Sequence, residues 1–116
     1  MSRITIYQKP TCTTCRQVGQ ILKEKGVPYD SVNYYTDPIP KTKLKELIAK
    51  LALPSQTLLR AKEAIYKKLN LKGRDLSQSE LVDLLAKHPD LLQRPIVEKG
   101  QKVILARPAE KIKELF

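Results

Sequence analysis

The chain has 116 residues and a formal net charge of +10, and this length suits one ordinary domain with one hydrophobic core. No apolar stretch is long enough to span a bilayer and the N-terminus lacks the apolar run of a secretory signal, so we expect a cytoplasmic protein that forms a single domain over residues 1–116. The lysines recur at helical spacing along residues 41–50 and 62–68 rather than in one basic block, which argues against direct nucleic-acid binding.

The first third of the chain predicts a strand, a helix and a second strand. The β-branched, alternating run RITIY predicts a strand over residues 3–7, and the turn around Pro10 follows it. Apolar residues at helical spacing then predict a helix within residues 15–26, which a glycine ends. A second strand is expected around residues 29–33. Together these elements make a β-α-β opening.

The middle of the chain reads as helical. Residues 40–53 carry leucines on one face and lysines on the other, which predicts an amphipathic helix. One or two short helices are expected within residues 55–73. Ser77 followed by Glu80 has the spacing of a capping box, so a further helix should begin there and run to His88. We assign His88 a structural role at the C-terminus of that helix, where its partial charge complements the helix dipole.

The last quarter of the chain predicts a β-hairpin and a final helix. Two β-rich runs flank the turn EKGQK at residues 98–102, and Pro108 stands in the first turn of the last helix. The full order is that of an α/β protein with a thioredoxin-like fold and a helical insertion between its β-α-β and β-β-α halves. In such folds a cis proline begins the third strand beside the active cysteine, and Pro95 occupies that place. An ordinary trans turn proline is the alternative, because most X-Pro bonds are trans.

The two cysteines of the chain, Cys12 and Cys15, form a C-x-x-C pair between the first strand and the first helix. In a reducing cytosol such a pair points to redox chemistry or metal binding. A zinc site would need ligands from a second chain, because the sequence adds only one histidine. Cys12 should lie at the amino end of a helix, where unpaired backbone N–H groups and the dipole favour a thiolate. We therefore expect Cys12 to be nucleophilic.

Four stretches make the chain resemble, nearly end to end, the ArsC-type arsenate reductases and the related Spx/MgsR and YffB-like proteins. They are ITIYQKPTCTTCR, LLRAKE, HPDLLQRPIV and LARPAE. The resemblance implies that Cys12 attacks arsenate and that one arginine from each later stretch holds the oxyanion, namely Arg60, Arg94 and Arg107. It implies no bound cofactor, and reduction by glutathione with glutaredoxin or by thioredoxin.

The implied arginines have a physical rationale. A thiolate must attack an oxyanion that is itself negative, and the repulsion has to be offset. Arginine is always charged, and its planar fork can donate two parallel hydrogen bonds to a pair of oxyanion oxygens. The same charges would lower the pKa of Cys12. Taken singly, each arginine could instead be a solvated surface charge, and Arg60 in particular lies among other charged residues.

Two departures from the reductase pattern stand beside the cysteines. Gln8 replaces a histidine of the ArsC-type reductases, which removes a nearby imidazole. Cys15 replaces the serine of the enzymes that use glutathione and glutaredoxin, and it resembles the C-x-x-C of the Spx branch. Cys15 could therefore resolve a Cys12 adduct and leave an internal disulfide.

The alternative function is a redox-sensing transcriptional regulator of the Spx type. Such regulators use the C-x-x-C as a switch and bind the α-subunit of RNA polymerase through a surface that includes a glycine. The corresponding segment here, AKLALPSQTLL, has no glycine, and the chain keeps Arg107, which the regulators generally lack. Both features favour the reductase interpretation.

Overall fold

The computed structural model describes residues 3–9 and 11–115, and Pro10, the expected turn proline, lies outside them. The described residues form two compact units. The sheet unit consists of residues 3–38, without residue 10, and 94–115; the helical unit consists of Ile39–Gln93. The single domain over residues 1–116 stays a prediction.

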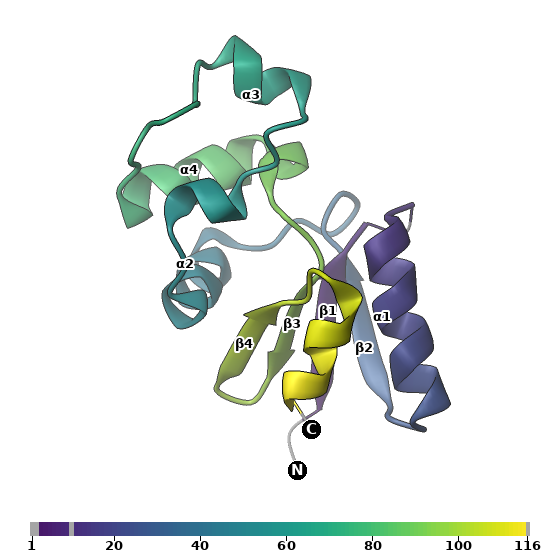
Figure 1. Cartoon of the computed structure of the whole chain (residues 1–116). Helices are drawn as coiled ribbons and strands as arrows, with labels where there is room; N and C mark the ends of the chain where they lie inside the picture. Colours follow the sequence, from purple (N-terminus) through teal and green to yellow (C-terminus); the bar gives the residue numbers. More distant parts are fainter. Residues whose placement is uncertain (1–2, 10, 116) are drawn as a thin grey trace. The chain divides into compact units, whose positions relative to one another are not determined.

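A four-stranded mixed sheet forms the centre of the sheet unit, with the strand order β2-β1-β3-β4 (Figure 1). The strands are β1 (Ile4–Gln8), β2 (Tyr29–Asn33), β3 (Ile96–Lys99) and β4 (Lys102–Leu105). β1 and β2 are parallel, whereas β3 is antiparallel to both β1 and β4. β2 has the predicted bounds, and β1 begins one residue later than predicted. The hairpin of β3 and β4 is also confirmed.

Helix α1 (Thr13–Glu24) and the 3₁₀ helix η3 (Ala109–Leu115) pack against one another beside this sheet. Val18 and Leu22 lie one turn apart on α1 and are fully buried, because the i, i+4 spacing puts them on one helix face. They join a core cluster with residues of β1, β3 and η3 and with the residue after β4, namely Ile4, Ile6, Val97, Ala106, Ala109, Ile112 and Leu115. This core fixes the start of α1 relative to the ends of the strands.

The last helix differs in type from the expectation, which was an ordinary helix with Pro108 in its first turn. It is a 3₁₀ helix whose buried residues are Ala109, Ile112 and Leu115. A 3₁₀ helix has three residues per turn, so this spacing of three places all of them on one face towards the core. The apolar repeat therefore fits the tighter helix.

The helical unit contains two packed α-helices and several shorter elements. Its elements are α2 (Lys41–Leu51), η1 (Ser55–Leu58), α3 (Ala64–Lys68), α4 (Gln78–Lys87) and η2 (Pro89–Leu91). α2 packs on α4 and ends at Leu51, two residues before the predicted end, and its C-cap Ala52 has a left-handed φ of 52°. None of the helices within the described ranges is long and apolar enough to cross a membrane. The whole order is the predicted thioredoxin-like fold with a helical insertion.

The start of α4 has the predicted capping box. The Ser77 hydroxyl accepts a hydrogen bond from the Glu80 backbone N–H at 3.2 Å, and the Glu80 carboxylate accepts one from the Ser77 N–H at 3.1 Å. Replacing Ser77 by alanine is expected to lower the free energy of unfolding by about 1 kcal/mol. The Glu80 N–H loses the hydroxyl that accepts its hydrogen bond, and the reciprocal bond from the Ser77 N–H is no longer held in place. Urea unfolding followed by circular dichroism measures this change. Ser79→Ala, an exposed position on the same helix, is the matched control, and an equal loss in both variants would contradict the prediction.

Candidate active site around Cys12

Four chain segments meet at one end of the sheet. Gln8 pairs with Asn33, so the segments that follow β1 and β2 leave the sheet at the same end. Tyr7 pairs with Ile96, so β3 begins there. Ile96 pairs with Leu105, so β4 ends there. The register thus gathers the segments that contain Cys12, Tyr34, Tyr35, Arg94 and Arg107.

Cys12 occupies the N-cap position of α1. Its backbone is extended, with φ −77° and ψ 121°, and its sulfur accepts a hydrogen bond from the backbone N–H of Cys15 at 3.3 Å. Its carbonyl accepts the first helical hydrogen bond, from the N–H of Arg16 at 3.1 Å. The sulfur therefore takes the place that a serine or aspartate oxygen takes in ordinary N-caps. Unpaired N–H groups and the helix dipole favour negative charge at this position.

The pKa values of the two thiols are shifted in opposite directions. Burial alone would raise the pKa of Cys12, but hydrogen bonds from the side chain and backbone of Cys15 and the positive charge of Arg94 outweigh it, so the pKa lies below the ordinary value. Burial, followed by the hydrogen bond with Cys12, raises the pKa of Cys15 to about 12. Both cysteines are free. Of the two thiols, Cys12 is therefore the one that ionises at lower pH, while Cys15 remains a thiol at neutral pH.

Arg94 is a buried cation, with 6 % of its surface exposed. Its Nη1 donates hydrogen bonds to the hydroxyl oxygens of Tyr34 and Tyr35, at 3.4 and 3.2 Å. Its Nε is buried and has no hydrogen-bond partner within residues 3–9 and 11–115. The peptide bond from Arg94 to Pro95 is cis, at the position where the thioredoxin-like fold has its cis proline. A buried guanidinium held by neutral hydroxyls keeps its charge available to an anion.

The other two arginines of the predicted set lie in different units. Arg107 belongs to the sheet unit, and its Nη1 donates a hydrogen bond to the backbone carbonyl of Arg94 at 2.9 Å. Arg60 belongs to the helical unit, where its backbone N–H donates to the Leu91 carbonyl at 2.8 Å and its Nε lies 3.8 Å from a carboxylate oxygen of Glu63. Contact of Arg60 with the oxyanion stays a prediction.

Sequence reasoning missed the two tyrosines that hold Arg94. Their signal was present in the sequence, because Tyr34 and Tyr35 directly follow β2, and residues beyond the carboxyl ends of parallel strands often build sites. Without the strand register, nothing in the sequence links them to Arg94, which lies 60 and 59 residues further along the chain. Gln8, which replaces the histidine of the reductases, donates a hydrogen bond to the Ser31 hydroxyl on β2.

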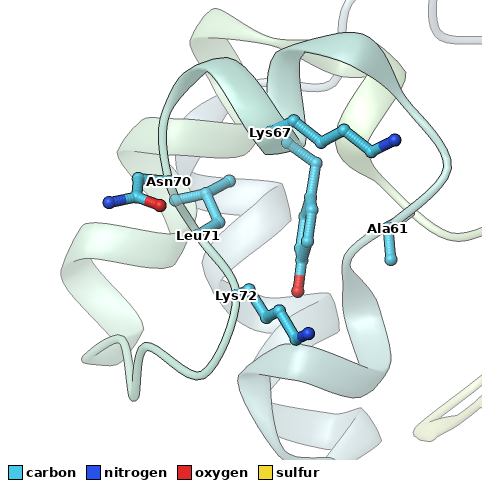
Figure 2. Close-up of a pocket in the computed structure, with 6 residues that line it drawn as sticks. Ala61, Lys67, Asn70, Leu71 and Lys72 are labelled. Atoms are coloured by element: carbon cyan, nitrogen blue, oxygen red, sulfur yellow. The ribbon is translucent and has the colours of Figure 1, made fainter.

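A separate pocket of about 380 Å³ lies in the helical unit (Figure 2). It is lined by Ala61, Tyr66, Lys67, Asn70, Leu71 and Lys72. This lining contains no cysteine and no carboxylate, so it offers no counterpart to the chemistry of the Cys12 site. No group of three or more His, Cys, Asp or Glu side chains in the described part of the chain is arranged to hold a metal ion.

Comparisons with known proteins agree on one family. The sequence profile described as "ArsC family" matches residues 7–115. An arsenate reductase from Neisseria meningitidis serogroup A is 35% identical over 117 residues, which cover 100% of both chains. The uncharacterized protein YfgD of Escherichia coli K12 is 35% identical over 114 residues, covering 97% of this chain and 96% of its own. The solved structure of an arsenate reductase from Vibrio cholerae superposes with a TM-score of 0.90 at 31% identity, covering 99% of this chain and 98% of that one.

Proposed function

The chain belongs to the ArsC family, and on that premise we propose that it reduces an oxyanion, arsenate being the first candidate, by attack of the Cys12 thiolate. One observation carries the proposal. The buried guanidinium of Arg94, held by tyrosine hydroxyls, adds to the hydrogen bonds from Cys15 in lowering the pKa of the cysteine at the N-cap of α1. A single cation thereby favours both the nucleophile and a negative substrate.

Arg94 and Arg107 are proposed to bind the oxyanion together. The unpartnered Nε of Arg94 is a buried donor that is costly to leave without an acceptor, and an oxyanion oxygen would supply one. Arg107 is attached to the Arg94 carbonyl through Nη1, which leaves other N–H groups of its fork for the same ligand. Arg60 is proposed as the third ligand, on the strength of the LLRAKE motif alone.

The chemistry balances with two thiols of the chain and one external dithiol. The Cys12 thiolate forms a bond to arsenic, and an oxygen of arsenate leaves as water after protonation. Cys15 then attacks the Cys12 sulfur, and the sulfur–arsenic bond breaks with its electron pair remaining on arsenic. As(V) becomes As(III) and leaves as arsenite, while the cysteines become a disulfide. A dithiol partner such as thioredoxin, or glutathione with glutaredoxin, restores the two thiols.

The high pKa of Cys15 suits the second step rather than opposing it. The hydrogen bond and charge of the Cys12 thiolate are, after burial, the causes that raise it. Both causes disappear once Cys12 is bonded to arsenic, so the Cys15 pKa should fall when its attack is required. Its proton can pass to an oxygen of the departing arsenite. Cys15 would then act as the resolving cysteine only after the adduct has formed.

Arsenate-dependent NADPH oxidation tests the proposed function. The assay couples the protein either to glutathione, glutaredoxin and glutathione reductase or to thioredoxin and thioredoxin reductase. We expect turnover with at least one donor system. No turnover with either system, together with co-purification of the RNA polymerase α-subunit, would replace the enzyme with a transcriptional regulator.

Replacing Cys15 by serine is expected to reduce the thioredoxin-coupled rate by about tenfold or more while the glutathione-coupled rate falls by less than about threefold. Glutathione can attack the Cys12 adduct from outside, whereas the dithiol route requires the internal disulfide. The backbone N–H that caps the Cys12 sulfur is unaffected by this change. Cys15→Ala separates the loss of the thiol from the burial of a hydroxyl. An equal loss with both donors would exclude a resolving role.

A further inference from the structure

One aromatic ring lies against two cations of the sheet unit. The Arg94 guanidinium carbon is 5.9 Å from the centroid of the Tyr35 ring, and the Lys9 ammonium nitrogen is 4.6 Å from the same centroid. The Tyr35 hydroxyl also accepts the hydrogen bond from Arg94. Lys9 belongs to the loop of the nucleophile, because its carbonyl accepts a hydrogen bond from the backbone N–H of Cys12 at 3.0 Å.

We propose that Tyr35 is a positioning residue of the Cys12 site, which holds Arg94 with its Nε edge open to an oxyanion and keeps Lys9 beside it as a second cation. The proposal deepens the proposed function and rests on it for the identity of the ligand, a doubly charged tetrahedral oxyanion. The placement of Arg94 beside the thiolate can be tested without any substrate.

The hydrogen bonds of Arg94 leave one donor of its fork, Nε, without a partner among the described residues. Nη1 is occupied by two tyrosine hydroxyls, whereas Nε is buried without an acceptor in the described segments. A carboxylate in the place of Tyr34 or Tyr35 would fix the guanidinium equally well but would neutralise it. A phenol oxygen accepts the hydrogen bond and leaves the positive charge for a negative ligand.

The backbone of Tyr35 is itself held in place by the turn that ends β2. The side-chain oxygen of Asn33 accepts a hydrogen bond from the Tyr35 N–H at 3.1 Å, which is the pattern of an Asx-turn. The rings of Tyr34 and Tyr35 contact each other, with centroids 5.1 Å apart and planes tilted by 35°. Tyr35 therefore presents a ring with little freedom to move, as a positioning role requires.

The Tyr35 ring also restricts the position of the Lys9 side chain. A lysine ammonium on a flexible stem otherwise samples many rotamers, and the face of a tyrosine ring attracts it without neutralising it. With Lys9 and Arg94 against one ring, two positive charges that repel each other lie 4.6 and 5.9 Å from its centroid. An anion that carries two negative charges would relieve this repulsion, which favours dianionic over monoanionic ligands.

The test compares Tyr35→Phe, which removes only the hydroxyl, with Tyr35→Leu, which removes the ring. The readout is the pH midpoint of Cys12 alkylation by iodoacetamide, with Tyr66→Phe as the matched control, because Tyr66 gives its hydroxyl hydrogen bond to Gln56 in the helical unit. We expect the midpoint to rise by about half a pH unit in Tyr35→Phe and by about one unit in Tyr35→Leu, since Arg94 is held less firmly beside the thiolate. The control should remain at the wild-type midpoint.

Substrate kinetics supply the second readout. The KM for arsenate should rise about tenfold in Tyr35→Leu, with a smaller change in kcat, because the cations bind the substrate before the chemical step. A wild-type alkylation midpoint in Tyr35→Phe and in a folded Tyr35→Leu would overturn the positioning role. A shifted midpoint in a protein whose wild type does not turn over arsenate would support that role and refute the proposed function instead.

Discussion

Replacement of Cys12 by serine is expected to abolish arsenate reduction with both donor systems, by at least about four orders of magnitude in kcat. A serine hydroxyl is not ionised near neutral pH, so the attacking anion is lost. It also cannot form the disulfide through which the external donor supplies electrons. The coupled NADPH assay measures the loss, with Cys15→Ser as the comparison that keeps the nucleophile.

The same substitution carries its own control for folding. Serine is a preferred N-cap residue, and its oxygen can accept the hydrogen bond that the Cys12 sulfur now accepts from the Cys15 N–H. The thermal unfolding midpoint of Cys12→Ser should therefore equal or exceed that of the wild type. Activity above about one per cent of wild type in a folded Cys12→Ser protein would place the nucleophile elsewhere.

Replacing Arg94 by alanine is expected to reduce kcat/KM for arsenate by about a thousandfold, and replacing it by lysine by a smaller factor. Alanine removes both the fork that binds the oxyanion and the charge that lowers the pKa of Cys12. Lysine keeps a charge but has no planar pair of donors. Comparing kcat/KM of the two variants separates the contribution of the Arg94 charge from that of its planar pair of donors.

The pH dependence of activity shows in which direction Arg94 shifts the pKa of Cys12. The pKa of Cys12 is below its ordinary value in the folded protein, and we expect the proposed activity to rise with pH as Cys12 ionises. Without Arg94 the acid limb of the profile should move to higher pH, and thiolate absorbance near 240 nm should titrate with it. Arg3→Ala is the matched control, because Arg3 pairs with Asp30 near the opposite end of β1. An unchanged acid limb in Arg94→Ala would remove Arg94 from the activation of Cys12.

Local signals made much of the fold predictable. β2 and the capping box of α4 depend on residues close together in the sequence, and both were correctly predicted. The position of Cys12 at the start of α1 followed from strand, turn and helix in one short stretch. The last helix differs in type from the expected one, because Pro108 at a first turn suits any helix, whereas an apolar spacing of three residues fits a 3₁₀ helix.

The interior of the candidate site could not be derived in the same way. The contact of Tyr35 with Arg94 depends on the register of β2, β1 and β3, and a sequence does not state its strand register. The burial of Arg94 also cannot be predicted from the sequence, because the residue has ordinary polar and apolar neighbours along the chain. The resemblance named Arg60, Arg94 and Arg107 by motif, but it did not supply the partners that hold them.

The unequal exposure of the two cysteines constrains the order of events in the proposed turnover. Cys15 has 1 % of its surface exposed and Cys12 has 9 %, so an incoming molecule meets the Cys12 sulfur first. On the proposed mechanism, oxidant and reductant would both react at the Cys12 sulfur, so they would bind one after the other. Such an enzyme alternates between two half-reactions and gives parallel lines in double-reciprocal plots, the kinetic pattern of ping-pong exchange.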